Sequence, residues 1–266
     1  MKNLIRTNGD LIDEGRWDLD YHLPPELLKR YPVDKRIQVS EYAYVSKEKR
    51  DPSERPDQIF MYIDIASVDV EAGAITNPQE LSGEEAPSRA RMVVHAYDLI
   101  VSTCRPTRGA IAVVPVELHG QICSTGFTVL RCREGVNPFF LQYVLRLDST
   151  LEQFRKFATG SSYPAILDSD VLRTQVPAAS PKEQDAIAAS TMAAFNEWRR
   201  TLEEANSKFK AALRQAGDSL ARGDAGNEKN LPLALDPSDS FVSIAAIRNS
   251  LEELEIMSPG QVSLRG

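Results

Sequence analysis

The sequence lacks any long apolar run. No stretch approaches the roughly 20 apolar residues that a membrane-spanning helix needs, and residues 1–15, MKNLIRTNGDLIDEG, hold no apolar core of signal-peptide type. Cysteine is also scarce, with only Cys104, Cys123 and Cys132, an odd number without CxxC spacing. We therefore expect a cytoplasmic protein with no membrane association, in a reducing compartment where the three cysteines are small core residues.

The signatures of several enzyme classes are absent. The chain has no HExxH or paired-cysteine zinc motif and no GxxxxGK[ST] phosphate-binding loop, which argues against a metal site and ATP-driven motion in this chain. A cysteine nucleophile with a histidine base is conceivable, but core cysteines and surface histidines are the simpler interpretation of these residues. The candidates for that pair are Cys104 or Cys123 with His95 or His119.

Two further enzyme-like patterns have plainer interpretations. NPFF at 137–140 lacks the second proline of the Asn-Pro-Pro-aromatic motif of amino-methyltransferases. Asn137 therefore fits better as a helix N-cap, with Pro138 at the first helical position. Asp64, Asp69 and Glu71 resemble a nuclease metal site, but their spacing favours the polar face of a strand. We expect neither catalysis nor a bound cofactor.

A net positive charge is missing as well. The formal charge is −7, which taken whole argues against nucleic acid, because DNA binding usually needs a basic surface. The charge is uneven, however. Residues 89–133 carry six arginines against Asp98 and Glu117, whereas residues 224–266 carry seven acidic residues against three basic ones. An acidic tail can therefore hide a basic face in the sum, although a single arginine is most often a solvated surface charge.

The first 180 residues have the sequence pattern of an α+β domain. Short segments rich in Val, Ile, Tyr, Phe and Thr, separated by Gly, Pro, Asn and Asp, predict a strand series and a twisted, mostly antiparallel sheet with flanking helices. The predicted strands are RIQVSEYAYV, QIFMYIDIASVDV, ARMVVHAYDLIVSTCRP (two strands), GAIAVVPV and QICSTGFTVLRC. Residues 137–158 predict one or two helices, and 165–176 a strand or turn.

Residues 181–222 differ in kind. Apolar residues recur at spacings of 3 and 4 with no proline after the helix start and no glycine before Gly217, which predicts one long helix with a coiled-coil seam. At 1.5 Å per residue it would reach about 60 Å. No second helix of equal length is predicted, so the seam needs another partner, and we favour an intermolecular one. The seam comprises Phe195, Trp198, Leu202, Ala205, Phe209 and Leu213.

These patterns predict three parts: an α+β domain over 1–180, the long helix over 181–222, and a linker with a short acidic amphipathic helix over 223–266. The last helix would place Phe241, Ile244, Ile247, Leu251 and Leu254 on one face.

The ordered blocks resemble the target recognition domain of the DNA-specificity subunit of type I restriction–modification systems. They are YIDIASVD (62–69), DLIVSTCRPTRGAIAVVP (98–115), CSTGFTVLR (123–131), NPFFLQYVLR (137–146), TGSSYPAILDSDVLRTQVP (159–177) and KEQDAIAA at the start of the long helix. That family implies a non-catalytic subunit with two recognition domains and two long antiparallel helices. This chain has one of each, so it is similar to a half-subunit.

The resemblance implies sequence-specific reading of one half of a split site in double-stranded DNA, without catalysis. It also implies docking of a DNA adenine methyltransferase that binds S-adenosylmethionine, and contact with a restriction nuclease-translocase. The helix would pair in a homodimer or with a second specificity chain. The alternative is a scaffold or acidic regulatory or decoy partner that does not bind DNA. The expected DNA contacts are Arg89, Arg91, Thr103, Arg105, Thr107, Arg108, Gly160, Ser161, Ser162 and Tyr163.

Overall fold

The computed structural model describes residue 16 and residues 18–222 of the chain. It divides into two compact units, Met1–Asn196 and Glu197–Gly266, and the helix α7 (Pro181–Arg222) runs from the first into the second. The predicted tail helix lies outside the described residues. No described helix is long and apolar enough to cross a membrane.

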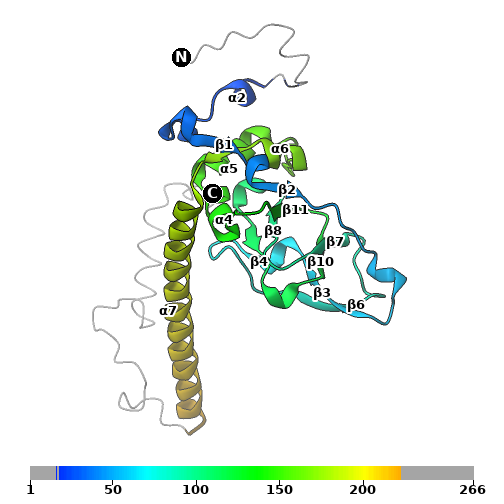
Figure 1. Cartoon of the computed structure of the whole chain (residues 1–266). Helices are drawn as coiled ribbons and strands as arrows, with labels where there is room; N and C mark the ends of the chain where they lie inside the picture. The colour runs from blue at the N-terminus through cyan, green and yellow to red at the C-terminus, as the bar shows by residue number, and fades with distance from the viewer. Residues whose placement is uncertain (1–15, 17, 223–266) are drawn as a thin grey trace, which may run out of the picture. The chain divides into compact units, whose positions relative to one another are not determined.

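Two four-stranded sheets form the centre of the first unit (Figure 1). The inner sheet has the order β2-β11-β8-β9 and the outer sheet the order β6-β3-β10-β7. All their pairings are antiparallel except that of β10 with β3. The strands are β2 (Ala43–Val45), β3 (Ile59–Ile63), β6 (Gln79–Ser82), β7 (Ala90–Val94), β8 (Leu99–Ser102), β9 (Ile111–Val113), β10 (Gln121–Ser124) and β11 (Phe127–Cys132).

The α+β prediction is therefore confirmed, and the predicted single sheet is resolved into two. Consecutive strands β10 and β11 belong to different sheets, and only Thr125 and Gly126 separate them. Two short antiparallel pairs complete the strands: β1 (Arg36–Gln38) with β12 (Gln175–Pro177), and β4 (Val68–Asp69) with β5 (Ala74–Ile75).

Alternation along β8 builds the core. Leu99 and Val101 pack with the helices, while Ile100 packs with residues of the outer sheet, because successive side chains of a strand point to opposite faces. Three layers result: helices, inner sheet and outer sheet. The helices are α3 (Val39–Tyr42), α4 (Pro138–Leu145), α5 (Asp148–Phe157) and α6 (Asp168–Arg173), with α2 (Leu19–His22) beside α5.

Short 3-10 turns link these elements. They are η1 (Leu27–Arg30), η2 (Val33–Lys35), η3 (Pro52–Glu54), η4 (Ile65–Ser67), η5 (Pro106–Arg108) and η6 (Val116–Leu118). The predicted N-cap is confirmed, because the Asn137 side chain accepts the backbone N–H of Phe139 and of Phe140.

Three local predictions are wrong. The segment RIQVSEYAYV is not one strand, because the α3 turn separates β1 from β2 and buries Val39 and Tyr42 together. The segment 165–176 contains the helix α6 as well as β12. The strand predicted through Asp64 and Asp69 is interrupted: β3 ends at Ile63, Asp64 caps η4, and Asp69 lies in the separate short strand β4.

Candidate nucleic-acid interface

Four chain segments meet through backbone hydrogen bonds at one edge of the first unit. The Thr125 N–H donates to the Arg89 carbonyl at 2.9 Å, and the Thr103 N–H donates to the Gly126 carbonyl at 2.9 Å. The Ile166 N–H donates to the Thr103 carbonyl at 3.0 Å. We call these segments, residues 88–90, 102–109, 124–126 and 159–166, the loop edge. The β10–β11 turn, where the chain changes sheets, is its centre.

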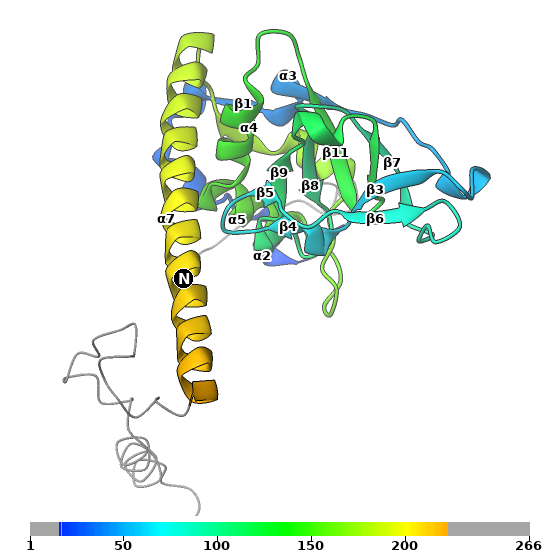
Figure 2. The ribbon, with the colours of Figure 1, turned by 90° about the horizontal axis from the view of Figure 1, so that it is seen from below.

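A small hairpin forms the most exposed part of the loop edge. Thr159 and Ala165 exchange both backbone hydrogen bonds, each at 2.9 Å, and thereby close the loop Gly160–Pro164. Gly160 has a φ of +89°, and an added Cβ would lie 3.1 Å from the Tyr163 carbonyl oxygen, so the turn needs glycine. This loop, seen in Figure 2 as the yellow-green hairpin that extends beyond β3 and β4, presents the exposed side chains of Ser161, Ser162 and Tyr163.

Arg105 is held against this hairpin. Its backbone N–H donates to the Pro164 carbonyl at 2.7 Å, and it adopts the left-handed conformation with φ 48° and ψ 54°. Its guanidinium carbon lies over the Tyr163 ring, 5.0 Å from the ring centroid, which is a cation–π contact. A non-glycine residue in this conformation is strained and persists only where its surroundings hold it. Two predicted contact residues 58 positions apart in the chain, 163 − 105, therefore form one unit.

The six arginines of the basic segment separate into two groups. Arg91 is 3.1 Å from Asp51, Arg131 donates twice to Asp98 at 2.9 Å, and Arg133 donates to the Ser40 carbonyl at 3.0 Å. The other three, all on the loop edge, have no side-chain hydrogen bond or ion pair within the described part of the chain; they are Arg89, Arg105 and Arg108. Within residues 89–133, the arginines without such a partner therefore all lie on the loop edge.

The loop edge brings together most of the predicted contact residues. Arg89, Arg105 and the hairpin are adjacent through the bonds above, and Thr107 and Arg108 are exposed on η5. The Thr103 side chain stabilises the loop edge itself, because its Oγ1 hydroxyl also donates to the Gly126 carbonyl at 2.9 Å. Arg91 is separated from this set by its ion pair with Asp51. The β10–β11 turn was missed, although the small residues of CSTG could have indicated it.

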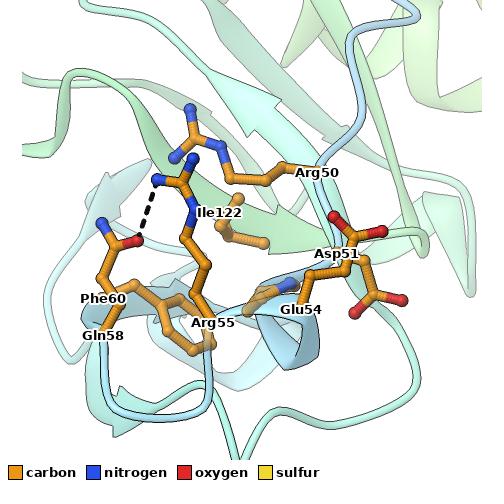
Figure 3. A pocket seen from close by; sticks show the side chains of 8 residues that line it. Arg50, Asp51, Glu54, Arg55, Gln58, Phe60 and Ile122 are labelled. Atoms are coloured by element: carbon orange, nitrogen blue, oxygen red, sulfur yellow. Dashed lines mark hydrogen bonds between the residues drawn. The ribbon is translucent and has the colours of Figure 1, made fainter.

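A separate hollow of about 110 Å³ lies over the face of the outer sheet that carries Phe60 and Ile122 (Figure 3). Arg50 and Arg55 line it, but their side chains already donate to the Gly120 carbonyl and to Gln58 Oε1. Acidic groups line the same hollow. Its mixed charge makes it a weaker anion site than the loop edge.

The enzyme-like patterns acquire structural explanations. Burial raises the pKa of the Cys123 thiol far above its ordinary value and that of Cys132 to about 12, so neither is a ready nucleophile. Asp64 caps η4 by accepting the Ser67 N–H at 2.9 Å. Among residues 16 and 18–222, no cluster of three or more His, Cys, Asp or Glu could hold a metal.

The second unit carries the greater part of the predicted seam. Within Glu197–Arg222 the large apolar side chains of Leu202, Phe209 and Leu213 are exposed, and they fall on one helical face at spacings of 7 and 4. Trp198 is 39% exposed, Ala205 is exposed, and Phe195, in the first unit, is half-buried. Exposed large apolar groups in a row are typical of an interaction face. The long helix begins at Pro181 and continues to Arg222, the last residue that the structure describes.

Comparisons with solved structures identify relatives of this fold. No family model and no curated protein matches the sequence. The HsdS subunit from Thermoanaerobacter tengcongensis is 36% identical over 70% of this chain and 49% of its own, with a TM-score of 0.57. A structure reported for complex assembly and conformational transition of the type I restriction–modification system is 35% identical over 76% of this chain and 51% of its own, with a TM-score of 0.57. The chain is thus a relative of the HsdS specificity subunits of type I restriction–modification systems, and it spans about half of the length of the relatives that it matches.

Proposed function

We propose that this chain is a DNA-specificity subunit that reads one half of a bipartite site. The observation that supports this most directly is the loop edge, where Arg89, Arg105 and Arg108 are unpaired in a protein of net charge −7. One solvated arginine at a surface is ordinary, but three without a partner that cluster beside hydroxyl side chains suit a polyanionic duplex.

The chain itself carries no catalysis in this proposal. A DNA adenine methyltransferase docks on it and supplies S-adenosylmethionine, and a restriction nuclease-translocase joins the complex. The long helix sets the distance between two recognition domains by pairing with the helix of a second copy or of another specificity chain. If two copies pair antiparallel, their two-fold symmetry predicts an interrupted palindrome as the DNA site.

The alternative is a scaffold or decoy that keeps the fold without DNA affinity. Salt dependence separates the two functions, because each phosphate contact adds about −0.9 to the slope of log affinity against log salt. We expect the full chain with its methyltransferase to retain duplex DNA in a sequence-dependent manner, with a steep negative slope. Binding that is absent at low salt for every duplex would establish the scaffold instead.

A second measurement tests the same proposal inside the cell. We expect methylated adenines, mapped across the host genome, to fall within one bipartite sequence when the chain is present. Deletion of the gene should remove that methylation. Methylation that persists unchanged after deletion would contradict the proposal.

A further inference from the structure

We infer that Arg105 reads a guanine base and that Tyr163 positions its guanidinium, whereas Arg89 and Arg108 contact phosphates. This inference rests on the proposed function and assigns the roles within it. It follows from differences in how the structure holds three arginines that the sequence alone cannot tell apart.

The backbone of Arg105 is fixed from both sides. Its N–H donates to the Pro164 carbonyl at 2.7 Å, and its carbonyl accepts the Arg108 N–H at 3.0 Å. Cys104 and Ala165 form a further antiparallel bridge. Because φ is 48°, the side chain leaves the backbone in a direction that an ordinary loop residue would not take. Strain maintained by several contacts is a feature of sites where one direction matters.

The side chain of Arg105 is pre-positioned as well. The Tyr163 ring lies under its guanidinium carbon at 5.0 Å, and no carboxylate pairs with Arg105 in the described chain. A cation–π contact uses no hydrogen bond, so the N–H donors of the guanidinium stay available for a base. Two such donors match O6 and N7 of guanine in the major groove, the commonest specific contact of arginine. By holding the Arg105 side chain in place, the Tyr163 ring therefore reduces the conformational entropy that this side chain loses when it makes a bidentate contact.

Arg108 and Arg89 lack these constraints. Both side chains are exposed, and neither has a ring contact, hydrogen bond or ion pair among the described residues. A long flexible cation of this kind suits a phosphate, which accepts contacts from many directions and carries no sequence information. Both flank the Arg105–Tyr163 pair along the loop edge, one on η5 and one beside the β10–β11 turn.

The test uses the full chain together with its methyltransferase and a library of duplexes with a randomised central segment. Selection with the wild-type protein first defines the preferred sequence. Arg105→Ala and Arg108→Ala are then compared, because each removes one guanidinium from the same loop. Thermal unfolding of each variant establishes that it is folded.

We expect Arg105→Ala to lose preference for guanine at one position by roughly 5- to 150-fold. We expect Arg108→Ala to keep the preferred sequence, to bind all duplexes more weakly, and to reduce the salt slope by about 1. Tyr163→Phe keeps the ring and should retain the preference. Tyr163→Leu removes the ring and should lose a large part of it at the same position as Arg105→Ala.

Each outcome either supports the inference or overturns it. If the wild-type protein enriches no sequence, the proposed function fails and this inference fails with it. If the wild-type protein enriches a sequence but Arg105→Ala weakens all duplexes equally, Arg105 is a phosphate contact and the inference alone is overturned. If Tyr163→Leu reads DNA as Tyr163→Phe does, the positioning role is overturned, and this holds even where Arg105→Ala does not fold.

Discussion

The side-chain amide of Gln184, in the first turn of α7, joins that helix to the start of α4 at Asn137. Its Oε1 accepts the Asn137 backbone N–H at 3.0 Å, and its Nε2 donates to the Ala179 carbonyl at 2.9 Å. Gln184 is only 3% exposed, so water does not replace these bonds. One residue thus anchors the start of the long helix on the rest of the first unit.

Replacing Gln184 by Leu should therefore destabilise the first unit. The change leaves the Asn137 N–H without this partner and leaves the Ala179 carbonyl only the Tyr42 hydroxyl at 3.4 Å, so we expect a loss of about 1–3 kcal/mol in the free energy of unfolding. Urea unfolding followed by circular dichroism measures it. Lys182→Leu is the matched control, because Lys182 is exposed and should change stability by less than about 0.5 kcal/mol. Equal stability of the two variants would contradict the anchoring role.

Arg131 belongs to the basic segment but should not contact DNA. Its Nε and Nη2 donate to the two oxygens of Asp98 at 2.9 Å, and Asp98 is 2% exposed and also accepts the His95 N–H at 2.8 Å. The hydrogen bonds to Asp98 are the main reason why the pKa of the Arg131 guanidinium is raised. We expect Arg131→Gln to cost about 2–4 kcal/mol in stability, because it leaves a buried carboxylate without its cation.

The salt dependence of DNA binding distinguishes this role from that of Arg108. Arg131→Gln should leave the salt slope of DNA binding unchanged, whereas Arg108→Ala reduces it by about 1. A reduced slope in folded Arg131→Gln protein would show that Arg131 contacts phosphate after all.

Asp20 makes stability depend on pH at the acidic end. Hydrogen bonds from Arg155, and then from Lys156, lower the pKa of Asp20 although desolvation opposes them. Lys156 is 5% exposed and donates to Asp20 Oδ1 at 3.1 Å and to the Asp20 carbonyl at 2.7 Å. A carboxyl whose pKa is lower in the folded state stabilises the protein above its unfolded pKa, and this contribution is lost as the pH falls through the folded pKa.

We therefore expect Asp20→Asn to destabilise the protein by up to about 1 kcal/mol at neutral pH, since half-exposed pairs are screened by solvent. The difference from the wild-type protein should shrink as the pH falls below about 4. Urea unfolding at a series of pH values measures both. Asp57→Asn is the control, because Asp57 has no hydrogen bond or ion pair in the described chain. A difference that stays constant down to acidic pH would exclude the ion-pair explanation.

Local secondary structure could be predicted from the sequence where a single rule decides it. The 3-and-4 spacing predicts α7, and Asn137 followed by Pro138 predicts the start of α4. The rules failed where tertiary bonds decide the conformation. Val39 and Tyr42 lie in a segment whose residue types favour a strand, but the Val39 N–H donates to the Thr174 carbonyl at 2.9 Å and the chain turns there. The acidic pair Asp168 and Asp170 was a missed signal for the start of α6.

The candidate site could be predicted only as a set of residue types. Arg105 and Tyr163 were both expected contacts, but the pairing of residues 103–105 with 164–166 is a long-range event that no local pattern encodes. Arg91 shows the converse case. It lies two residues from Arg89 in the sequence, and only the fold places Asp51 within 3.1 Å of it. Two nearby arginines therefore differ in whether the fold gives the guanidinium an acidic partner, and the sequence does not show this difference.

The seam on α7 should control assembly without affecting the first unit. Leu202 and Phe209 are 44% and 61% exposed, and burying both against a second helix would remove a large apolar area from water. We expect Leu202→Asp with Phe209→Asp to abolish self-association or pairing with another specificity chain, because two buried carboxylates would oppose it. Sedimentation of the full chain, alone and with its methyltransferase, measures the mass.

A matched control separates the seam from the helix as a whole. Ser207 and Ala211 are exposed and lie on the face opposite the seam, so Ser207→Asp with Ala211→Asp adds the same charge and should leave the mass unchanged. The unfolding midpoint of the first unit should be the same in both double variants, because neither changes a residue of it. A native mass for the seam variant would show that this face is not the pairing face, and loss of assembly in both variants would assign the effect to helix charge rather than to the seam.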